Sequence, residues 1–154
     1  MMKNVKTILV PIDFSDNSKK ILREAVSVAE NFGAKLEALF VVQSFEDYSG
    51  FFVPHIPIDQ FQAEMFASAA AKMDDFLEDN LENPEACGRH TATGDVGEEI
   101  IKYAKEIEAG MIVMGTHGYK GIERVLFGSV AEQVVKNAPC PVLTINPYQK
   151  SKKG

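Results

Sequence analysis

Glycines recur at close spacing in the stretch from residue 111 to residue 129, which reads MIVMGTHGYKGIERVLFGS. Gly115 and Gly118 are separated by two residues, and nine further residues lead to the pair Gly128 and Ser129. Because glycine lacks a Cβ atom, a ligand can approach the backbone closely, and the backbone N–H groups of a following helix start attract anions. The spacing therefore indicates a binding loop for a negatively charged group, with a triphosphate as the natural example.

The common nucleotide-binding motifs do not match this stretch. Its glycines do not fit G-x-G-x-x-G, and the chain contains no G-x-x-x-x-G-K-[ST] sequence. A second polar position, Asp13, follows Pro11 and Ile12 at the end of an apolar run. In open α/β sheets, ligands bind beyond the carboxyl ends of the strands, where the strand order reverses. If the strands that precede Asp13 and Gly115 are neighbours at that point, the two loops face one crevice.

The polar side chains of the glycine stretch have both functional and structural interpretations. Lys120 and Arg124 either contact phosphate groups or extend into solvent. His117 invites a catalytic role, but no carboxylate or nucleophile is linked to it in sequence to orient its ring. Ser129 lies in neither a G-x-S-x-G motif nor a triad pattern, so we interpret its hydroxyl as a phosphate donor. We therefore assign no catalytic residue.

Purely structural alternatives exist for the same positions. Asp13 fits an Asp-x-Ser helix start, since Ser15 is a suitable N-cap. Gly115 fits the end of a strand. The residue types alone leave these alternatives open.

The composition is that of an ordinary globular protein. The 154 residues are 45% hydrophobic and 25% charged, and a chain of this length is expected to form one domain over residues 1–154. The net charge of -6 and the absence of a basic stripe argue against nucleic-acid binding, because phosphate backbones favour clustered Lys and Arg. The lysines of residues 150–154 form a basic cluster, which we interpret as a solvated, flexible tail.

Membrane and disulfide signals are both missing. No apolar run approaches the roughly 18 residues that span a bilayer, and no signal-peptide core precedes Asp13. We therefore expect a cytoplasmic protein without membrane contact. Cys87 and Cys140 are far apart and form no C-x-x-C pattern, so neither a metal site nor a disulfide is indicated. We expect both to be packed or partly exposed thiols.

Apolar runs alternate with amphipathic helical patterns along the chain. Strands are expected at Thr7 to Ile12, Leu36 to Val42, Cys87 to Thr93, Met111 to Met114 and Val142 to Asn146. Helices are expected from Ser15 to Gly33, from Ile58 to Asn83, from Asp95 to Gly110 and from Ser129 to Asn137. This alternation predicts a single α/β domain with a five-stranded, mainly parallel sheet and helices on both faces.

Each expected helix has an apolar stripe that should face the core. In the first helix the stripe is Ile21, Leu22, Ala25, Val28, Ala29 and Phe32. In the long helix it is Phe61, Met65, Ala69, Met73, Phe76 and Leu77. In the last two helices it is Ile100, Ile101, Ala104 and Ile107, followed by Val130, Val134 and Val135.

The loop over residues 43–57 is unusually aromatic, with Tyr48, Phe51 and Phe52. One interpretation is that these rings pack against the body of the protein beside the next helix. The other is a mobile flap over a ligand, or a contact patch for a partner.

The motifs together resemble the universal stress protein family, in its ATP-binding branch. The segments that carry the resemblance are TILVPIDFS, IVMGTHGYKGIERVLFGSVAEQVV and APCPVLTI, with the motif G-x2-G-x9-G-[ST] inside the second. They cover nearly the whole chain. The resemblance implies a flavodoxin-like sheet in the order 3-2-1-4-5, with ATP between the first and fourth strands. It also implies a homodimer formed through the last strand, Val142 to Asn146.

The same resemblance implies which residues contact the nucleotide. They are Pro11, Ile12, Asp13, Val41, Met114, Gly115, Thr116, His117, Gly118, Lys120, Arg124, Gly128, Ser129 and Val130. Asp13 would lie at the ribose, because a carboxylate accepts hydrogen bonds from hydroxyl groups but repels phosphate. Val41 would lie beside the adenine.

One departure from the family pattern concerns Ala131, where some ATP-binding members carry a hydroxyl residue. One phosphate donor is then missing, so AMP or ADP is an alternative to ATP. The sequence offers no evident carboxylate pair for Mg²⁺, which would bind through the phosphates.

The expected function is that of an ATP-binding, homodimeric stress-response or regulatory protein with an unknown protein partner. One alternative is an ATPase, which we expect to be slow because no water-positioning residue is evident. The other is a nucleotide-free interaction module that acts through the aromatic segment 45–56. An open edge on the last strand would expose unpaired backbone, so we expect this edge to pair with a second chain.

Overall fold

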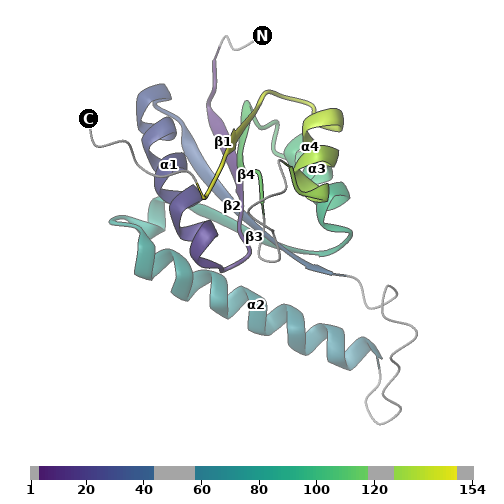
Figure 1. Cartoon of the computed structure of the whole chain (residues 1–154). Helices are drawn as coiled ribbons and strands as arrows, with labels where there is room; N and C mark the ends of the chain where they lie inside the picture. Colours follow the sequence, from purple (N-terminus) through teal and green to yellow (C-terminus); the bar gives the residue numbers. More distant parts are fainter. Residues whose placement is uncertain (1–3, 44–57, 118–126, 149–154) are drawn as a thin grey trace.

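The computed structural model describes residues 4–43, 58–117 and 127–148, and its centre is a five-stranded sheet (Figure 1). Its strands are β1 (Thr7–Pro11), β2 (Lys35–Gln43), β3 (Gly88–Gly94), β4 (Met111–Gly115) and β5 (Val142–Ile145). Their order is β3-β2-β1-β4-β5, and every neighbouring pair is parallel. The predicted flavodoxin-like order is therefore confirmed.

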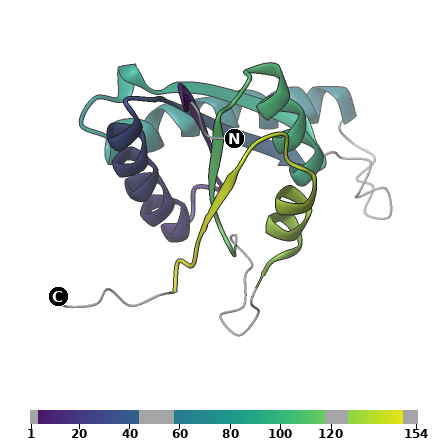
Figure 2. The same cartoon turned by 90° about the horizontal axis from the view of Figure 1, so that it is seen from above.

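Four α-helices cover the two faces of this sheet (Figure 2). They are α1 (Asp16–Phe32), α2 (Ile58–Asn80), α3 (Val96–Glu106) and α4 (Ser129–Asn137), with a short 3-10 helix at Pro84–Ala86. Helices α1 and α2 pack on one face, in a cluster that includes Ile8 and Val10 of β1. Helices α3 and α4 pack on the other face, in a cluster that includes Leu9. Residues 8–10 of β1 are all apolar and buried because both faces of the strand are covered.

The predicted helix ends are largely confirmed, because their capping groups are in place. The hydroxyl of Ser15 accepts a hydrogen bond from the amide of Ser18, and Gly33 ends α1 with a φ of 63°. The carboxylate of Asp95 accepts a hydrogen bond from the amide of Glu98 at the start of α3. Two helices end earlier than predicted. The long helix ends at Asn80 instead of Asn83, and a 3-10 turn follows at Pro84. Helix α3 ends at Glu106 instead of near Gly110, with Ile107 as its C-cap.

Three apolar residues predicted to face the core are exposed instead, namely Phe32 (43%), Met65 (41%) and Val135 (48%). Phe32 is the last residue of α1, beyond its last buried position at Ala29. Met65 lies in the N-terminal half of α2, which extends past the sheet (Figure 1). Val135 follows the fully buried Val134, about 100° further round the helix, which places its side chain outside the buried stripe of α4. The other apolar residues predicted at the core are buried or partly buried.

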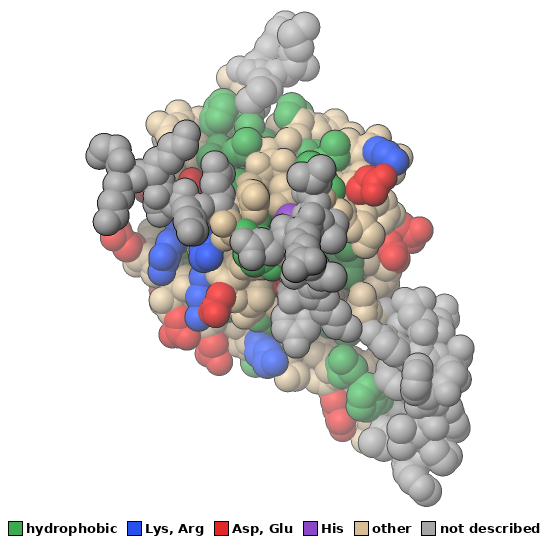
Figure 3. Space-filling model, viewed as in Figure 1, with side chains coloured by type: hydrophobic (Ala, Val, Ile, Leu, Met, Phe, Trp, Pro, Cys, Tyr) green, Lys and Arg blue, Asp and Glu red, His purple; other side chains and the backbone are tan. Residues whose placement is uncertain are grey.

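Charges of both signs are interspersed among the described side chains on the face shown in Figure 3. This face therefore has no continuous basic patch among those side chains. Within the described ranges, no helix is both long and apolar enough to cross a membrane.

Candidate functional site

Strands β1 and β4 separate at their carboxyl ends. Ladder pairs join β1 to β4 at Ile8 and Leu9, whereas β1 pairs with β2 as far as Pro11, and β4 pairs with β5 as far as Gly115. The helix after β1 lies on one face of the sheet, and the helix after β4 lies on the other. This is the point where the strand order reverses, and it brings the segments after Pro11 and Gly115 to one edge, as predicted.

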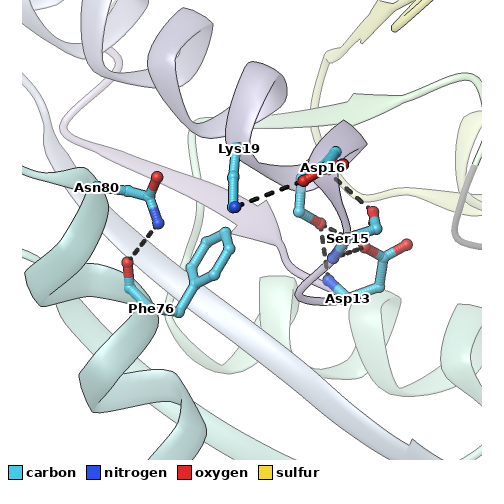
Figure 4. Close-up of polar contacts among 7 residues, drawn as sticks. Asp13, Ser15, Asp16, Lys19, Phe76 and Asn80 are labelled. Carbon is cyan, nitrogen blue, oxygen red and sulfur yellow. Dashed lines mark hydrogen bonds and ion pairs between the residues drawn. The ribbon is translucent and has the colours of Figure 1, made fainter.

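Asp13 lies between β1 and α1 and is held by neighbouring serines (Figure 4). Its Oδ1 accepts hydrogen bonds from the amide of Ser15 at 3.0 Å, from the hydroxyl of Ser15, and from the hydroxyl of Ser18 at 2.6 Å. The amide of Asp13 donates to the Ser18 hydroxyl at 2.8 Å. The interpretation of Asp13 as part of a helix start is therefore correct, but this use occupies Oδ1 alone. Within the described residues, Oδ2 has no hydrogen-bond partner.

Phe14 has a left-handed backbone conformation, with a φ of 64°. This region is costly for residues other than glycine. The ring of Phe14 packs against Phe40 of β2, with ring centroids 4.5 Å apart, and against Phe76 of α2 at 5.7 Å. Ring packing on both neighbours therefore holds the chain in this conformation directly after Asp13.

The N-terminus of α4 offers three backbone donors, as many as predicted, but they are not the same three. The amide of Gly128 donates to the carbonyl of Thr116 at 2.7 Å, so it is not free for a ligand. The amides of Ser129, Val130 and Ala131 make no hydrogen bond with any described residue, and no side chain caps this helix. The positive end of the helix dipole adds to these donors. The unbonded amides are therefore those of residues 129–131, one residue further along the chain than the predicted set, Gly128 to Val130.

His117 and Thr116 are both buried at the end of β4. The Thr116 amide donates to the carbonyl of Ile145 at 2.9 Å, and its hydroxyl lies 2.8 Å from Nδ1 of His117. The His117 ring also contacts Tyr148 edge to face, with centroids 5.3 Å apart. The imidazole is therefore held by protein groups at the start of the glycine loop. Gly118, Lys120 and Arg124 lie outside the described residues.

The apolar residues predicted to contact the nucleotide belong to the core beside the crevice. Ile12, Val41 and Met114 are each at most 7% exposed. Ile12 packs in the cluster of α1 and α2, and the other two pack in the cluster of α3 and α4. Ala131, which departs from the family pattern, is 2% exposed, so its side chain packs in the core.

The glycines at both ends of the loop are required by the protein itself. A Cβ atom on Gly115 would lie 3.0 Å from the carbonyl oxygen of His117. A Cβ atom on Gly128 would lie 3.2 Å from the carbonyl oxygen of Thr116. The structural interpretation of Gly115 as the end of a strand is therefore correct, and Gly128 has a similar close contact that was not predicted.

Sequence reasoning missed Ser18 and Phe14 as parts of this site. Ser18 is visible in the sequence as the last residue of the pattern D-x-S-x-x-S, which starts at Asp13. The left-handed conformation of Phe14 has no sequence signal, because aromatic residues rarely adopt it.

A separate cavity of about 300 Å³ lies beside β3 and α3. Its lining includes Phe66, His90, Tyr103, Glu99, Lys102 and Glu106. The rings of His90 and Tyr103 stack at 4.4 Å, and burial together with a 2.9 Å hydrogen bond to Glu37 raises the pKa of Tyr103. Its two carboxylates outnumber its one cation, so this cavity is less suited to a phosphate than the α4 N-terminus. In the described part of the chain, no group of three or more His, Cys, Asp or Glu is arranged to hold a metal ion.

Comparison with known proteins gives a consistent result. The model of the universal stress protein family matches residues 4–146. Universal stress protein MJ0531 of Methanocaldococcus jannaschii is 34% identical over 94% of this chain and 84% of its own length. The solved structure of UspA from Lactobacillus plantarum has a TM-score of 0.76 at 31% identity, covering 93% of this chain and 99% of its own.

A more distant solved structure contains a nucleotide. It is described as the universal stress protein from Archaeoglobus fulgidus in complex with dAMP. Its TM-score is 0.58 at 23% identity, over 92% of this chain and 98% of its own, which supports the fold. From the match to the family model and from the relatives above 30% identity, we conclude that this chain belongs to the universal stress protein family.

Proposed function

We propose that this chain binds an adenine nucleotide, with ATP as the expected ligand, beyond the carboxyl ends of β1 and β4. The proposal rests on two kinds of group at this edge of the sheet, namely backbone hydrogen-bond donors and a carboxylate acceptor. The amides of residues 129–131 at the start of α4 make no hydrogen bond within the described residues. On the β1 side, Oδ2 of Asp13 is also without a partner there.

The chemistry of these groups determines which end of the nucleotide lies at α4 and which end lies at Asp13. Free amides at a helix N-terminus attract phosphate oxygens, so the phosphates belong at Ser129. A carboxylate repels phosphate but accepts hydrogen bonds from hydroxyl groups, so the ribose belongs at Asp13. We expect the adenine near Val41, although Val41, Met114 and Ile12 are core residues, with Ile12 on one face of the sheet and the other two on the opposite face. A nucleoside phosphate matches the order of donors and acceptor.

The dAMP complex of the Archaeoglobus fulgidus protein supports a nucleotide in this fold. AMP or ADP is an alternative to ATP for the present chain, because Ala131 supplies no hydroxyl donor. We propose that Mg²⁺ binds through the phosphates. We also propose that the nucleotide state changes the contacts of a homodimer with a protein partner.

A substitution at the start of α4 tests the proposal. Ser129→Asp places an acidic residue in the first turn, where the helix dipole favours it, so the fold should be retained. The added carboxylate should repel the phosphates and weaken ATP binding by at least about tenfold. Ser68→Asp adds the same charge to an exposed position of α2 and serves as the matched control. Isothermal titration calorimetry measures both affinities.

Thermal unfolding supplies a second readout. Saturating ATP should raise the melting temperature of the wild type and of Ser68→Asp by about 5 °C or more, and that of Ser129→Asp by much less. Equal ATP affinities for all three proteins would refute the assignment of the phosphate site. No affinity and no melting shift in the wild type, with no nucleotide released when freshly purified protein is denatured, would refute nucleotide binding itself.

Hydrolysis is a separate question that the same protein can answer. We expect slow turnover at most, since the sequence shows no evident water-positioning residue. Measured phosphate release that is brisk and is lost in Ser129→Asp would make the protein an ATPase instead of a nucleotide-regulated binding protein.

A further inference from the structure

We propose that Ser18 is a positioning residue. It holds the Asp13 carboxylate in the orientation that accepts hydrogen bonds from the ribose hydroxyls. The inference rests on the proposed function, because it concerns the nucleoside end of the same site. In this proposal Ser18 acts through Asp13 and does not itself contact the ligand.

Ser18 contacts Asp13 at two points. Its hydroxyl donates to Oδ1 of Asp13 at 2.6 Å and accepts a hydrogen bond from the Asp13 amide at 2.8 Å. The Ser18 side chain is buried, with 6% exposure, so water does not compete for these bonds. One hydroxyl therefore fixes both the backbone and the side chain of Asp13.

Helix capping does not account for the Ser18 hydroxyl. The N-cap of α1 is Ser15, whose hydroxyl already accepts a hydrogen bond from the Ser18 amide at 3.2 Å. The Ser18 hydroxyl points back to Asp13 and satisfies no orphan amide of the first helical turn. Its contribution is therefore directed at the residue that precedes the helix.

The hydrogen bonds from the serines give the two carboxylate oxygens of Asp13 different roles. Oδ1 accepts three hydrogen bonds from Ser15 and Ser18, which fills its capacity. Figure 4 shows the other oxygen of Asp13 directed away from Ser15. That oxygen is left to accept hydrogen bonds from a ligand, as a ribose with vicinal hydroxyls would offer.

The backbone next to Asp13 is held in place independently of the serines. Phe14 has the left-handed φ of 64°, and its ring is fixed between Phe40 and Phe76. A conformation this costly persists because the surrounding packing determines it. The carboxylate is thus set before the ligand arrives, which removes an ordering cost from binding.

The test compares two nucleotides that differ in the ribose. Ser18→Ala should weaken ATP binding by about fivefold to tenfold, since it removes one charge-assisted hydrogen bond and leaves Oδ1 of Asp13 held by Ser15 alone. The same variant should change the affinity for 2′,3′-dideoxy-ATP by less than about twofold, because this ligand has no ribose hydroxyl for Asp13 to read. Ser27→Ala, at an exposed serine of the same helix, should leave both affinities unchanged.

A second variant covers the case in which Ser18→Ala folds poorly. Ser18→Cys keeps nearly the same volume but has a weaker donor, so it should show the same preference in a smaller degree. An equal loss for ATP and dideoxy-ATP would show a merely structural role and overturn the inference, as would an unchanged ATP affinity. Failure of the wild type to bind either nucleotide would instead overturn the proposed function, and this inference with it.

Discussion

The substitution Gly115→Ala tests whether the end of β4 sets the shape of the glycine loop. Gly115 has an ordinary negative-φ backbone, so alanine is compatible with its conformation. The difficulty is space, because the added Cβ atom would lie 3.0 Å from the carbonyl oxygen of His117 and 3.4 Å from the Ile21 side chain. Ordinary contact begins at 3.4 Å, so the backbone at His117 must move by about 0.4 Å.

Two backbone hydrogen bonds of the preceding residue, Thr116, oppose this movement. The Thr116 amide donates to Ile145, and the Thr116 carbonyl accepts from Gly128 at the start of α4. Overpacking against a restrained backbone costs about 1–3 kcal/mol. For a chain of this size that corresponds to a fall in melting temperature of about 2–10 °C. Because Gly128 is bonded to Thr116, the shift should also reach the α4 N-terminus and weaken ATP binding by about tenfold.

Urea unfolding and ATP titration measure the two effects, and Gly33→Ala is the matched control. Gly33 has a φ of 63° with no atom within 4 Å of an added Cβ, so alanine there costs only backbone strain, of about 1 kcal/mol. Gly33→Ala should therefore lose stability without losing ATP affinity. If Gly115→Ala keeps wild-type stability and affinity, the close contact with His117 does not constrain the loop and the reasoning fails.

Two further predictions concern the last strand and a buried thiol. Leu143→Glu should convert a dimer to a monomer at tens of micromolar in sedimentation experiments. Leu143 is 39% exposed on β5, and the outer edge of β5 has no partner strand within the described residues. A monomeric wild type would contradict the proposed interface. Burial raises the pKa of the Cys87 thiol to about 11 from its usual 9.0, so the fold favours the neutral thiol. The stability that comes from the neutral Cys87 thiol is present below pH 9 and is lost as the pH rises to about 11. The urea midpoint should therefore fall more steeply over this pH range for the wild type than for Cys87→Ala. Parallel curves of midpoint against pH would refute the raised pKa of Cys87.

The strands and their parallel direction could be predicted because local patterns determine them, whereas the strand order was implied by the family resemblance. Apolar runs such as Thr7 to Ile12 indicate a strand covered on both faces, and strand-helix alternation then dictates parallel crossovers. The caps at Ser15, Gly33 and Asp95 follow from residue types with a direct hydrogen-bonding reason. These features depend on neighbours within a few residues, and they are correct.

The errors arose where the outcome depends on distant parts of the chain. Helical periodicity identifies an apolar stripe, but it does not show how far the sheet extends beneath it, so Met65 on the projecting part of α2 was misplaced. The use of the Gly128 amide by Thr116 likewise depends on how β4 meets α4. At the candidate site, the sequence prediction that the segments after β1 and β4 meet at one edge of the sheet is correct. The locking of Asp13 by Ser18 was not predicted, because it needs the left-handed turn at Phe14.

The central place of β1 in the sheet has a consequence for how the chain is made. On the ribosome, β1 emerges first and can pair with β2 soon afterwards, but its other edge waits for β4, which lies in the second half of the chain. Until β4 is released, one side of Ile8 and Leu9 remains without its partner strand. Such an edge is open to wrong pairing during synthesis, so slow translation before β4 should increase misfolding. The pairing of β1 with β4, at the edge where we propose that the nucleotide binds, therefore forms only after the second half of the chain has begun to emerge.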